Sequence, residues 1–236
     1  MAPRTQQTYA GNLTDAQIDQ GLRSYMLKVY NYMTSGLALT GLVAYLVAHT
    51  GLFAAIYGSG LGFVVMLAPL GIVFFMGFKI EKMKASTAQA LFWAFSVLMG
   101  VSLSYIFIVY TDTSIMRVFF ITAAMFGAMS LYGYTTKRSL ARWGSFLFMG
   151  LIGVVIAMVV NIFLQSSMMH FVISVIGVIV FTGLTAYDTQ RIKAVYAESD
   201  GQSVMTKKAV MGALSLYLNF INMFIMLLHL FGGQRS

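Results

Sequence analysis

The most regular feature of the chain is the alternation of long apolar runs with short polar stretches. Seven runs are long enough to form helices that cross a membrane, because a bilayer core requires about 20 consecutive apolar residues. The connections between them are short, which leaves no room for a second domain and places consecutive helices side by side. We therefore predict an all-α integral membrane protein with seven transmembrane helices. The runs cover residues 29–48, 60–78, 87–110, 115–134, 143–164, 168–190 and 209–231.

The same pattern divides the chain into three parts. Residues 1–24 are predicted to form a polar cytoplasmic segment that ends in a short amphipathic lead-in helix. Residues 25–232 form the seven-helix membrane domain, and residues 233–236 form a short tail. The polar start of the chain is expected to be accessible on the cytoplasmic side.

The basic residues predict the orientation of the helices in the membrane. If the N-terminus lies in the cytoplasm, 13 of the 15 Lys and Arg residues fall on the cytoplasmic side. Cytoplasmic loops of membrane proteins carry such an excess, so we predict an N-in, C-out topology. Arg117 and Arg235 are the exceptions. The 13 residues are Arg4, Arg23, Lys28, Lys79, Lys82, Lys84, Lys137, Arg138, Arg142, Arg191, Lys193, Lys207 and Lys208.

Composition supports the membrane class and excludes others. The chain is 59% hydrophobic and 9% charged, whereas soluble domains carry about 25% charged residues. The formal charge of +8 is spread between apolar runs and forms no basic stripe, so no nucleic-acid partner is expected. The absence of cysteine excludes disulfides and thiolate ligands. We predict membrane lipids as partners and no enzymatic activity, no cofactor and no metal site. His49, His170 and His229 are interpreted as separate interfacial histidines.

The last apolar run differs from the other six because polar residues recur along it. Small and polar residues follow each other at spacings of three and four, so they share one face of a helix. Lipid cannot satisfy the amides of Asn219 and Asn222, and this face must therefore meet other helices or water. Such a helix suits the middle of a bundle. The residues are Gly212, Ser215, Asn219, Asn222, Met226 and His229.

Asp188 is the only acidic residue inside any of the seven runs. A carboxylate at the centre of a membrane helix costs roughly 2.5–3.5 kcal/mol, which marks such a residue as a functional candidate. One interpretation is a helix end that reaches the cytoplasmic surface and pairs with Arg191, three residues on. The other is a partly buried, titratable carboxylate that lines a polar path with Thr185. Counting from the charged ends of both helices favours Ser215 over Asn219 as its partner.

Four segments resemble the Bax inhibitor-1 family of membrane proteins, and within it the bacterial, YccA-like branch. They are "KVYNYMTSGLALTG" at 28–41, "SLYGYTTKRSLARWGSFLFMGLIG" at 130–153, "GLTAYDTQRIK" at 183–193 and "LSLYLNFINMF" at 214–224. The likeness extends from about Leu22 to Gly232. It implies seven helices with the seventh at the centre, in the inner membrane of a bacterium.

The resemblance also implies a proton-sensitive calcium leak. In the family, an aspartate on helix six and another on helix seven share a hydrogen bond near the cytoplasmic side. Asp188 matches the first position, and Asn219 stands at the second, so this chain has one titrating carboxylate there. Arg191 and Lys193 are its expected charge partners. Calcium prefers several carboxylates, and the candidate oxygen donors predict passage rather than tight storage. They are Asp188, Asn219, Asn222, Ser215 and Thr185.

Two other functions are compatible with some of these features. An intramembrane aspartyl protease is disfavoured, because such an enzyme needs two carboxylates that share a proton. Relatives in the bacterial branch are associated with regulation of a membrane-anchored, ATP-dependent protease of the FtsH type. That resemblance implies a regulatory binding protein with residues 1–24 as the contact segment, because proteases engage accessible polar tails.

Overall fold

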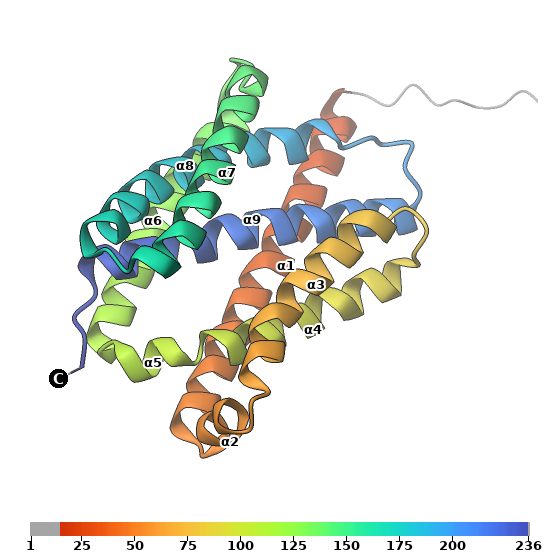
Figure 1. Cartoon of the computed structure of the whole chain (residues 1–236). Coiled ribbons are helices and arrows are strands. Elements are labelled where there is room, and N and C mark those ends of the chain that lie inside the picture. The colour runs from red at the N-terminus through yellow and green to blue at the C-terminus, as the bar shows by residue number, and fades with distance from the viewer. Residues whose placement is uncertain (1–14, 236) are drawn as a thin grey trace, which may run out of the picture.

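The computed structural model describes residues 15–235, with side chains from Gln20 onward. These residues form nine helices, and Figure 1 shows them as one bundle. Seven spans are long and apolar enough to cross a membrane, which confirms the predicted number; α4 and α5 together make one of them. The helices are α1 (Asp15–His49), α2 (Leu52–Gly58), α3 (Gly62–Lys79), α4 (Ala85–Leu103), α5 (Tyr105–Val109), α6 (Asp112–Thr135), α7 (Ala141–Leu164), α8 (Ser167–Ala194) and α9 (Gln202–Phe231).

The helices extend beyond the predicted runs at several ends. α8 continues to Ala194 and α9 begins at Gln202, so both include charged residues that the apolar runs excluded. Arg191 and Lys193 lie in the last turn of α8, where cations interact favourably with the helix dipole. The third span is interrupted at Ser104, and the short helix α2 was not predicted. Hydropathy locates apolar segments and is insensitive to such terminal turns.

The lead-in helix is continuous with the first membrane span. α1 begins at Asp15 and passes without a break through the predicted boundary between residues 24 and 25. Tyr25, Met26 and Val29 are buried, so the apolar face of this region packs into the bundle. Residues 1–14, which carry most of the predicted polar N-terminal segment, lie outside the described residues.

α9 is the central helix of the bundle, as predicted. In its most apolar window 72% of the residues are buried, whereas the next most buried span reaches 44%. α8, α1, α6 and α4 all pack against it, and Figure 1 shows it crossing the middle of the bundle. A helix buried on nearly every side can carry polar groups only where its neighbours supply hydrogen-bond partners.

Glycines allow the closest helix contacts. A side chain at Gly133 on α6 would overlap the carbonyl oxygen of Ala186 on α8. A side chain at Gly177 on α8 would come within 3.0 Å of Met226 on α9. Helices in lipid associate through such small residues, which let their backbones approach. Both contacts hold α8 tightly between α6 and α9.

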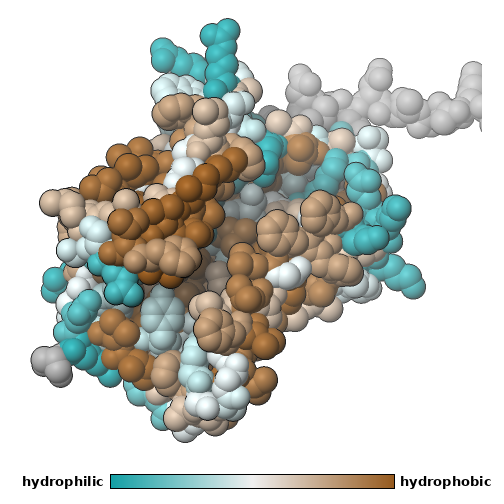
Figure 2. Space-filling view, viewed as in Figure 1, coloured by the Kyte–Doolittle hydropathy of each residue, from teal (hydrophilic) through white to brown (hydrophobic). Residues whose placement is uncertain are grey.

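The outer surface of the bundle is apolar. Only 11% of the most apolar window of α7 and 17% of that of α3 are buried, and exposed residues such as Phe78 and Phe163 are large and hydrophobic. Figure 2 shows hydrophobic residues over this side of the molecule, with hydrophilic residues gathered toward the two ends. This distribution is the one expected of a bundle surrounded by lipid.

The two ends of the bundle differ in charge. One end carries the start of the first span and the loops 80–84, 136–140 and 195–201, and we call it the basic end. At the opposite end, residues 233–235 form a C-terminal strap against the junction of α5 and α6. The amide of Gly233 donates to Ser114 Oγ at 2.9 Å, and the amide of Arg235 donates to the Val109 carbonyl at 2.9 Å. Arg235 also pairs with Asp112 at 2.9 Å.

Candidate functional site

Asp188 lies near the basic end of α8, on the face that packs against α9. The residue is 6% exposed, although it is only six residues from the end of its helix. α8 is unbroken through Gly183, and its extension to Ala194 carries the carboxylate inward relative to the loop. A buried carboxylate requires hydrogen-bond donors or an opposite charge.

The partners of Asp188 come from both helices. Asn219 Nδ2 donates to Asp188 Oδ2 at 2.8 Å, and Ser215 Oγ donates to the same oxygen at 3.1 Å. Arg191 Nη2 pairs with Asp188 Oδ1 at 2.9 Å and donates to Ser215 Oγ at 3.2 Å. Asp188, Arg191, Ser215 and Asn219 therefore form one connected group, which we call the Asp188 cluster. Every carboxylate oxygen has a donor, which is how a buried charge is stabilised.

The geometry combines the two interpretations of Asp188 that the sequence left open. The carboxylate is buried against the central helix, and it also pairs with Arg191 on its own helix. The side chain of Arg191 is 52% exposed, whereas that of Asp188 is 9% exposed, so the arginine spans from the cluster to the surface. Counting inward from Arg191 underestimated the depth of Asp188, because that count assumed the guanidinium marks the membrane surface.

Three other predicted residues lie outside the Asp188 cluster. Thr185 is fully buried and donates to the Phe181 carbonyl of its own helix at 2.8 Å. Asn222 likewise donates to the Leu218 carbonyl at 2.8 Å. Lys193 Nζ donates to the carbonyl of Tyr134 on α6 at 2.9 Å and lies over the ring of that tyrosine.

A cavity of about 390 Å³ adjoins the cluster at the basic end. Arg191 and Ser215 form part of its wall, together with residues of α1, α3 and α9. Lys208 also lines it and pairs with Asp200 at 2.5 Å. The hydroxyl of Tyr25, at the same wall, is buried and has no hydrogen-bond partner among the described residues. Arg191 and Ser215 thus contact both the buried carboxylate and the cavity, and Arg191 is the charged member of the two.

A second buried polar group on α9 was missed from the sequence. The hydroxyl of Tyr217 donates to Thr40 Oγ1 at 2.7 Å, and Thr40 donates to the Ser96 carbonyl at 2.8 Å. Tyr217 is fully buried between Phe92 and Phe95 of α4. We call Tyr217, Thr40 and Ser96 the neutral node. It joins α9 to α1 and α4, and no spacing rule connects residues so far apart in the chain.

The interpretation of the three histidines as separate was wrong for two of them. The rings of His170 and His229 lie 4.4 Å apart, at the neighbouring ends of α8 and α9. His49 stacks on Tyr45 of its own helix. In the described part of the chain, no group of three or more His, Asp or Glu side chains is arranged to hold a metal ion.

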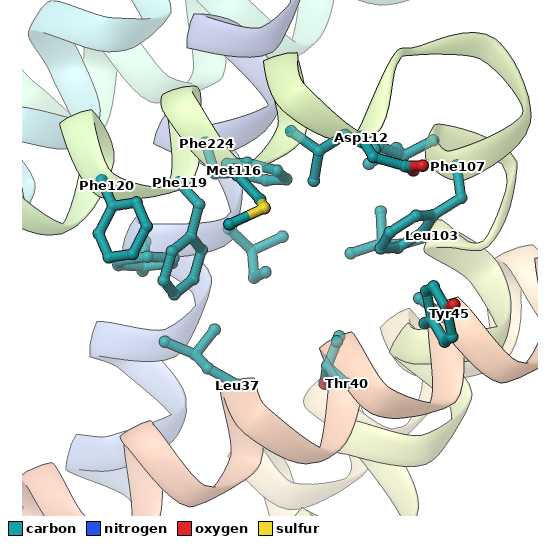
Figure 3. A pocket seen from close by; sticks show the side chains of 16 residues that line it. Leu37, Thr40, Tyr45, Leu103, Phe107, Asp112, Met116, Phe119, Phe120 and Phe224 are labelled. Carbon is teal, nitrogen blue, oxygen red and sulfur yellow. The ribbon is translucent and has the colours of Figure 1, made fainter.

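An apolar hollow lies toward the opposite end of the bundle. It has a volume of about 460 Å³ and lies between α1 and α6, with α9 behind it. Figure 3 shows Leu37 and Thr40 of α1 facing Met116 and Phe119 of α6 across it. Its side chains are mostly aliphatic and aromatic, so it offers few groups for binding an ion.

Fold and site together define a polytopic α-helical membrane protein that is built around a central helix. A buried carboxylate on the neighbouring helix is hydrogen-bonded to the central helix near the basic end. The family model described as inhibitor of apoptosis-promoting Bax1 matches residues 22–236. The chain therefore belongs to the Bax inhibitor-1 family, as the four sequence segments had indicated.

Curated bacterial relatives are similar over nearly their whole length. An uncharacterized protein of Rickettsia prowazekii is 50% identical over 221 residues, which cover 92% of this chain and 93% of the relative. The inner membrane protein YbhL of Escherichia coli K12 is 47% identical over 219 residues, which cover 91% and 94%. An uncharacterized protein of Borreliella burgdorferi is 42% identical over 215 residues, with 90% and 93% covered.

Proposed function

We propose that this protein is a cation leak of the Bax inhibitor-1 type, with calcium as the principal ion, and that protonation of Asp188 opens it. The observation that carries the proposal is the position of Arg191. This residue bonds to a carboxylate that is 6% exposed and lines the cavity at the basic end. A charged group in that position blocks the path of a cation by repulsion and by its volume.

The closed state is held by the Asp188 cluster. The ionised carboxylate attracts Arg191 and accepts hydrogen bonds from Ser215 and Asn219, which joins α8 to α9 at their basic ends. Charge-assisted hydrogen bonds of this kind are about twice as strong as neutral ones. The neighbouring cations are occupied elsewhere, since Lys193 bonds to Tyr134 and Lys208 to Asp200.

Protonation of Asp188 weakens the contacts that hold the closed state. A neutral carboxyl group no longer attracts the guanidinium, and its proton competes with the donors of Asn219 and Ser215 for the same oxygens. Arg191, already half exposed, then moves toward water and leaves the cavity wall. Flux through the protein should therefore rise as the pH falls.

The proposed site favours transit over storage. Asp188 is the single carboxylate of the cluster, and Ser215 and Asn219 supply neutral oxygens. Calcium takes about 6–8 oxygen ligands and is held tightly only by several carboxylates. A path with at most one ionised carboxylate releases a dehydrated cation readily, which conduction requires.

We place the protein in the inner membrane of a bacterium with its N-terminus in the cytoplasm. The orientation is supported by the 13 of 15 basic residues that alternate to one side. The compartment is supported by the printed name of the Escherichia coli relative, an inner membrane protein.

Flux measurements on liposomes loaded with a calcium dye test the proposal. Wild-type protein should conduct calcium faster at acidic than at neutral pH, and Asp188→Asn should remove that pH dependence, because the amide cannot titrate. Asp200→Asn is the matched control, since Asp200 also pairs with a cation at the basic end but lies outside the cluster. Absence of flux in the wild type, or an unchanged pH profile in Asp188→Asn, would refute the assignment.

Regulation of a membrane-anchored protease stays a second prediction from the sequence. Its contact segment lies mainly in residues 1–14, outside the described residues. Deletion of residues 2–12 should abolish association with an FtsH-type protease and leave calcium flux intact. Loss of flux with retained association would reverse that division of roles.

A further inference from the structure

The groove between α1 and α6 at the basic end shares no residue with the Asp188 cluster. A cavity of about 590 Å³ lies there, lined on one side by residues of α1 and on the other by residues of α6. Leu27 and Leu131, at its rim, are 53% and 64% exposed, so the cavity opens on the outside of the bundle. In a membrane, that opening faces the acyl chains of lipids.

A line of hydroxyl groups connects α1, α6 and α8 at the wall of the groove. Tyr30 on α1 is bonded to Ser130 on α6 at 2.5 Å, and Ser130 is bonded to Thr189 on α8 at 3.0 Å. Thr189 donates to the Thr185 carbonyl, so the protons run from Tyr30 to Ser130 to Thr189. These bonds are made below the mouth of the cavity and set the separation of the two helices.

The mouth of the groove is positively charged. Arg23 lines the cavity and is exposed, and it forms no ion pair with any described residue. Lys193 lies 4.9 Å from the ring centroid of Tyr134, which also lines the cavity. Arginine binds phosphate oxygens in a planar, bidentate manner. The groove therefore combines a cationic mouth with an apolar interior.

The interior has space that no side chain fills. Gly127 on α6 lies in the wall of the groove, and a side chain added there would meet no atom within 4 Å. Met26, Leu27 and Phe126 supply apolar surface around it. An acyl chain fits such a wall, whereas a free phosphate ion would gain nothing from it.

We propose that the α1–α6 groove binds an anionic phospholipid from the leaflet at the basic end. Its phosphate contacts Arg23, and one acyl chain lies along Leu27 and Gly127. The arrangement of charge supports this occupant, because the cations lie at the membrane surface and the apolar wall lies below it. The inference is independent of the leak, since none of the groove residues belongs to the Asp188 cluster.

Hydrogen bonds connect the helices beside the bound lipid to α8. The lipid lies against the helices that Tyr30 and Ser130 connect, and the line of hydroxyls ends at Thr189, the residue after Asp188. An occupied groove stabilises the observed spacing of α1 and α6. It thereby holds the α8 backbone beside the carboxylate.

Native mass spectrometry of the purified full chain tests the site. The protein is titrated with phosphatidylglycerol and, separately, with phosphatidylcholine of the same acyl chains. We expect preferential retention of phosphatidylglycerol, and Arg23→Gln should lower that preference about fivefold, the contribution of one basic residue near an anionic surface. Retention of phosphatidylcholine by the variant should stay unchanged, because the apolar wall is intact.

A pair of glycine variants distinguishes lipid binding in the groove from lipid binding elsewhere on the outer surface of the bundle. Gly127→Leu should reduce retention of both lipids severalfold, because a Cβ at this position meets no atom within 4 Å and the larger side chain would occupy the cavity. Gly153→Leu on α7 is the matched control, since Gly153 is also exposed and has equally open surroundings. Circular dichroism establishes that both variants remain folded.

Three results would overturn the proposal. Equal retention of the two lipids by the wild type would show that the mouth of the groove does not favour an anionic lipid headgroup. Equal behaviour of the two glycine variants would place the lipid elsewhere. Displacement of phosphatidylglycerol by inorganic phosphate alone would indicate an ion site without a lipid. Asp188→Asn should bind lipid normally, so failure of the leak hypothesis leaves this test unaffected.

Discussion

Two buried polar groups lie two residues apart on the central helix and differ in nearly every other respect. Tyr217 and Asn219 point to opposite sides of α9, because two residues turn an α-helix by about 200°. Tyr217 belongs to the neutral node, which is closed: each hydroxyl has a partner and the surroundings are aromatic. Asn219 belongs to the Asp188 cluster, which contains a charge pair and adjoins a cavity.

The contrast separates stability from function on one helix. A neutral group whose hydrogen bonds are all made has no charge state to switch to, so it fixes the packing of α9 on α1 and α4. A carboxylate with a half-exposed partner can lose its charge and release that partner. Polar residues on a central membrane helix therefore need not share a role, even when they are close in sequence.

The largest effect on the neutral node should come from Tyr217→Ala. The change leaves a cavity between Phe92 and Phe95 and removes the hydrogen bond that Thr40 accepts, and we expect a loss of about 3 kcal/mol or more in stability. Thermal melting in detergent micelles measures it. Tyr217→Phe, which keeps the ring, should cost only about 1 kcal/mol. Equal losses in the two variants would mean that the hydroxyl, rather than the ring, carries the node.

Arg191→Gln should act on flux and leave the fold nearly unchanged. Exposed ion pairs contribute up to about 1 kcal/mol, and the side chain of Arg191 is half exposed. Loss of this pair lowers the ratio of closed to open protein about fivefold, so the open population, and with it calcium flux at neutral pH, should rise by roughly that factor. Lys208→Gln, which also lines the cavity but does not contact Asp188, is the control. A rise in both variants would point to the charge of the cavity and not to the pair.

The smallest effect should come from Asn219→Asp, which changes the shape of the pH response. The new carboxylate would lie at the distance of the present 2.8 Å hydrogen bond from Asp188. Two carboxyl groups so close titrate as a coupled pair in two steps. The pH profile of flux should broaden or split relative to the wild type. An unaltered profile would indicate that the two positions do not interact in the conducting protein.

The architecture was accessible from the sequence because its signals are local. Apolar runs of about 20 residues identify membrane helices directly. The polar face from Gly212 to His229 also showed that the last helix needs partners on more than its lipid side, and α9 is indeed central. Asp188 stood out because a carboxylate within an apolar run is costly.

The parts that were missed depend on distances between helices. Thr40 and Tyr217 meet across 177 positions of the chain, and neither residue is unusual in its own segment. Asn222 looked equivalent to Asn219, yet its amide bonds to its own helix. Only the relative rotation and depth of α8 and α9 decide which asparagine reaches Asp188, and periodicity within one helix contains neither quantity.

The C-terminal strap limits how the central helix can move. Backbone and side-chain hydrogen bonds attach residues 233–235 to Val109 and Ser114, so the far end of α9 cannot slide along its axis without breaking them. Displacement of α9 relative to α8 is then restricted to a tilt about the attached end. The displacement that a tilt produces is smallest near the pivot and grows along the helix. A small rotation therefore barely moves His229, and it separates α9 from α8 most at Ser215 and at the residues that precede it.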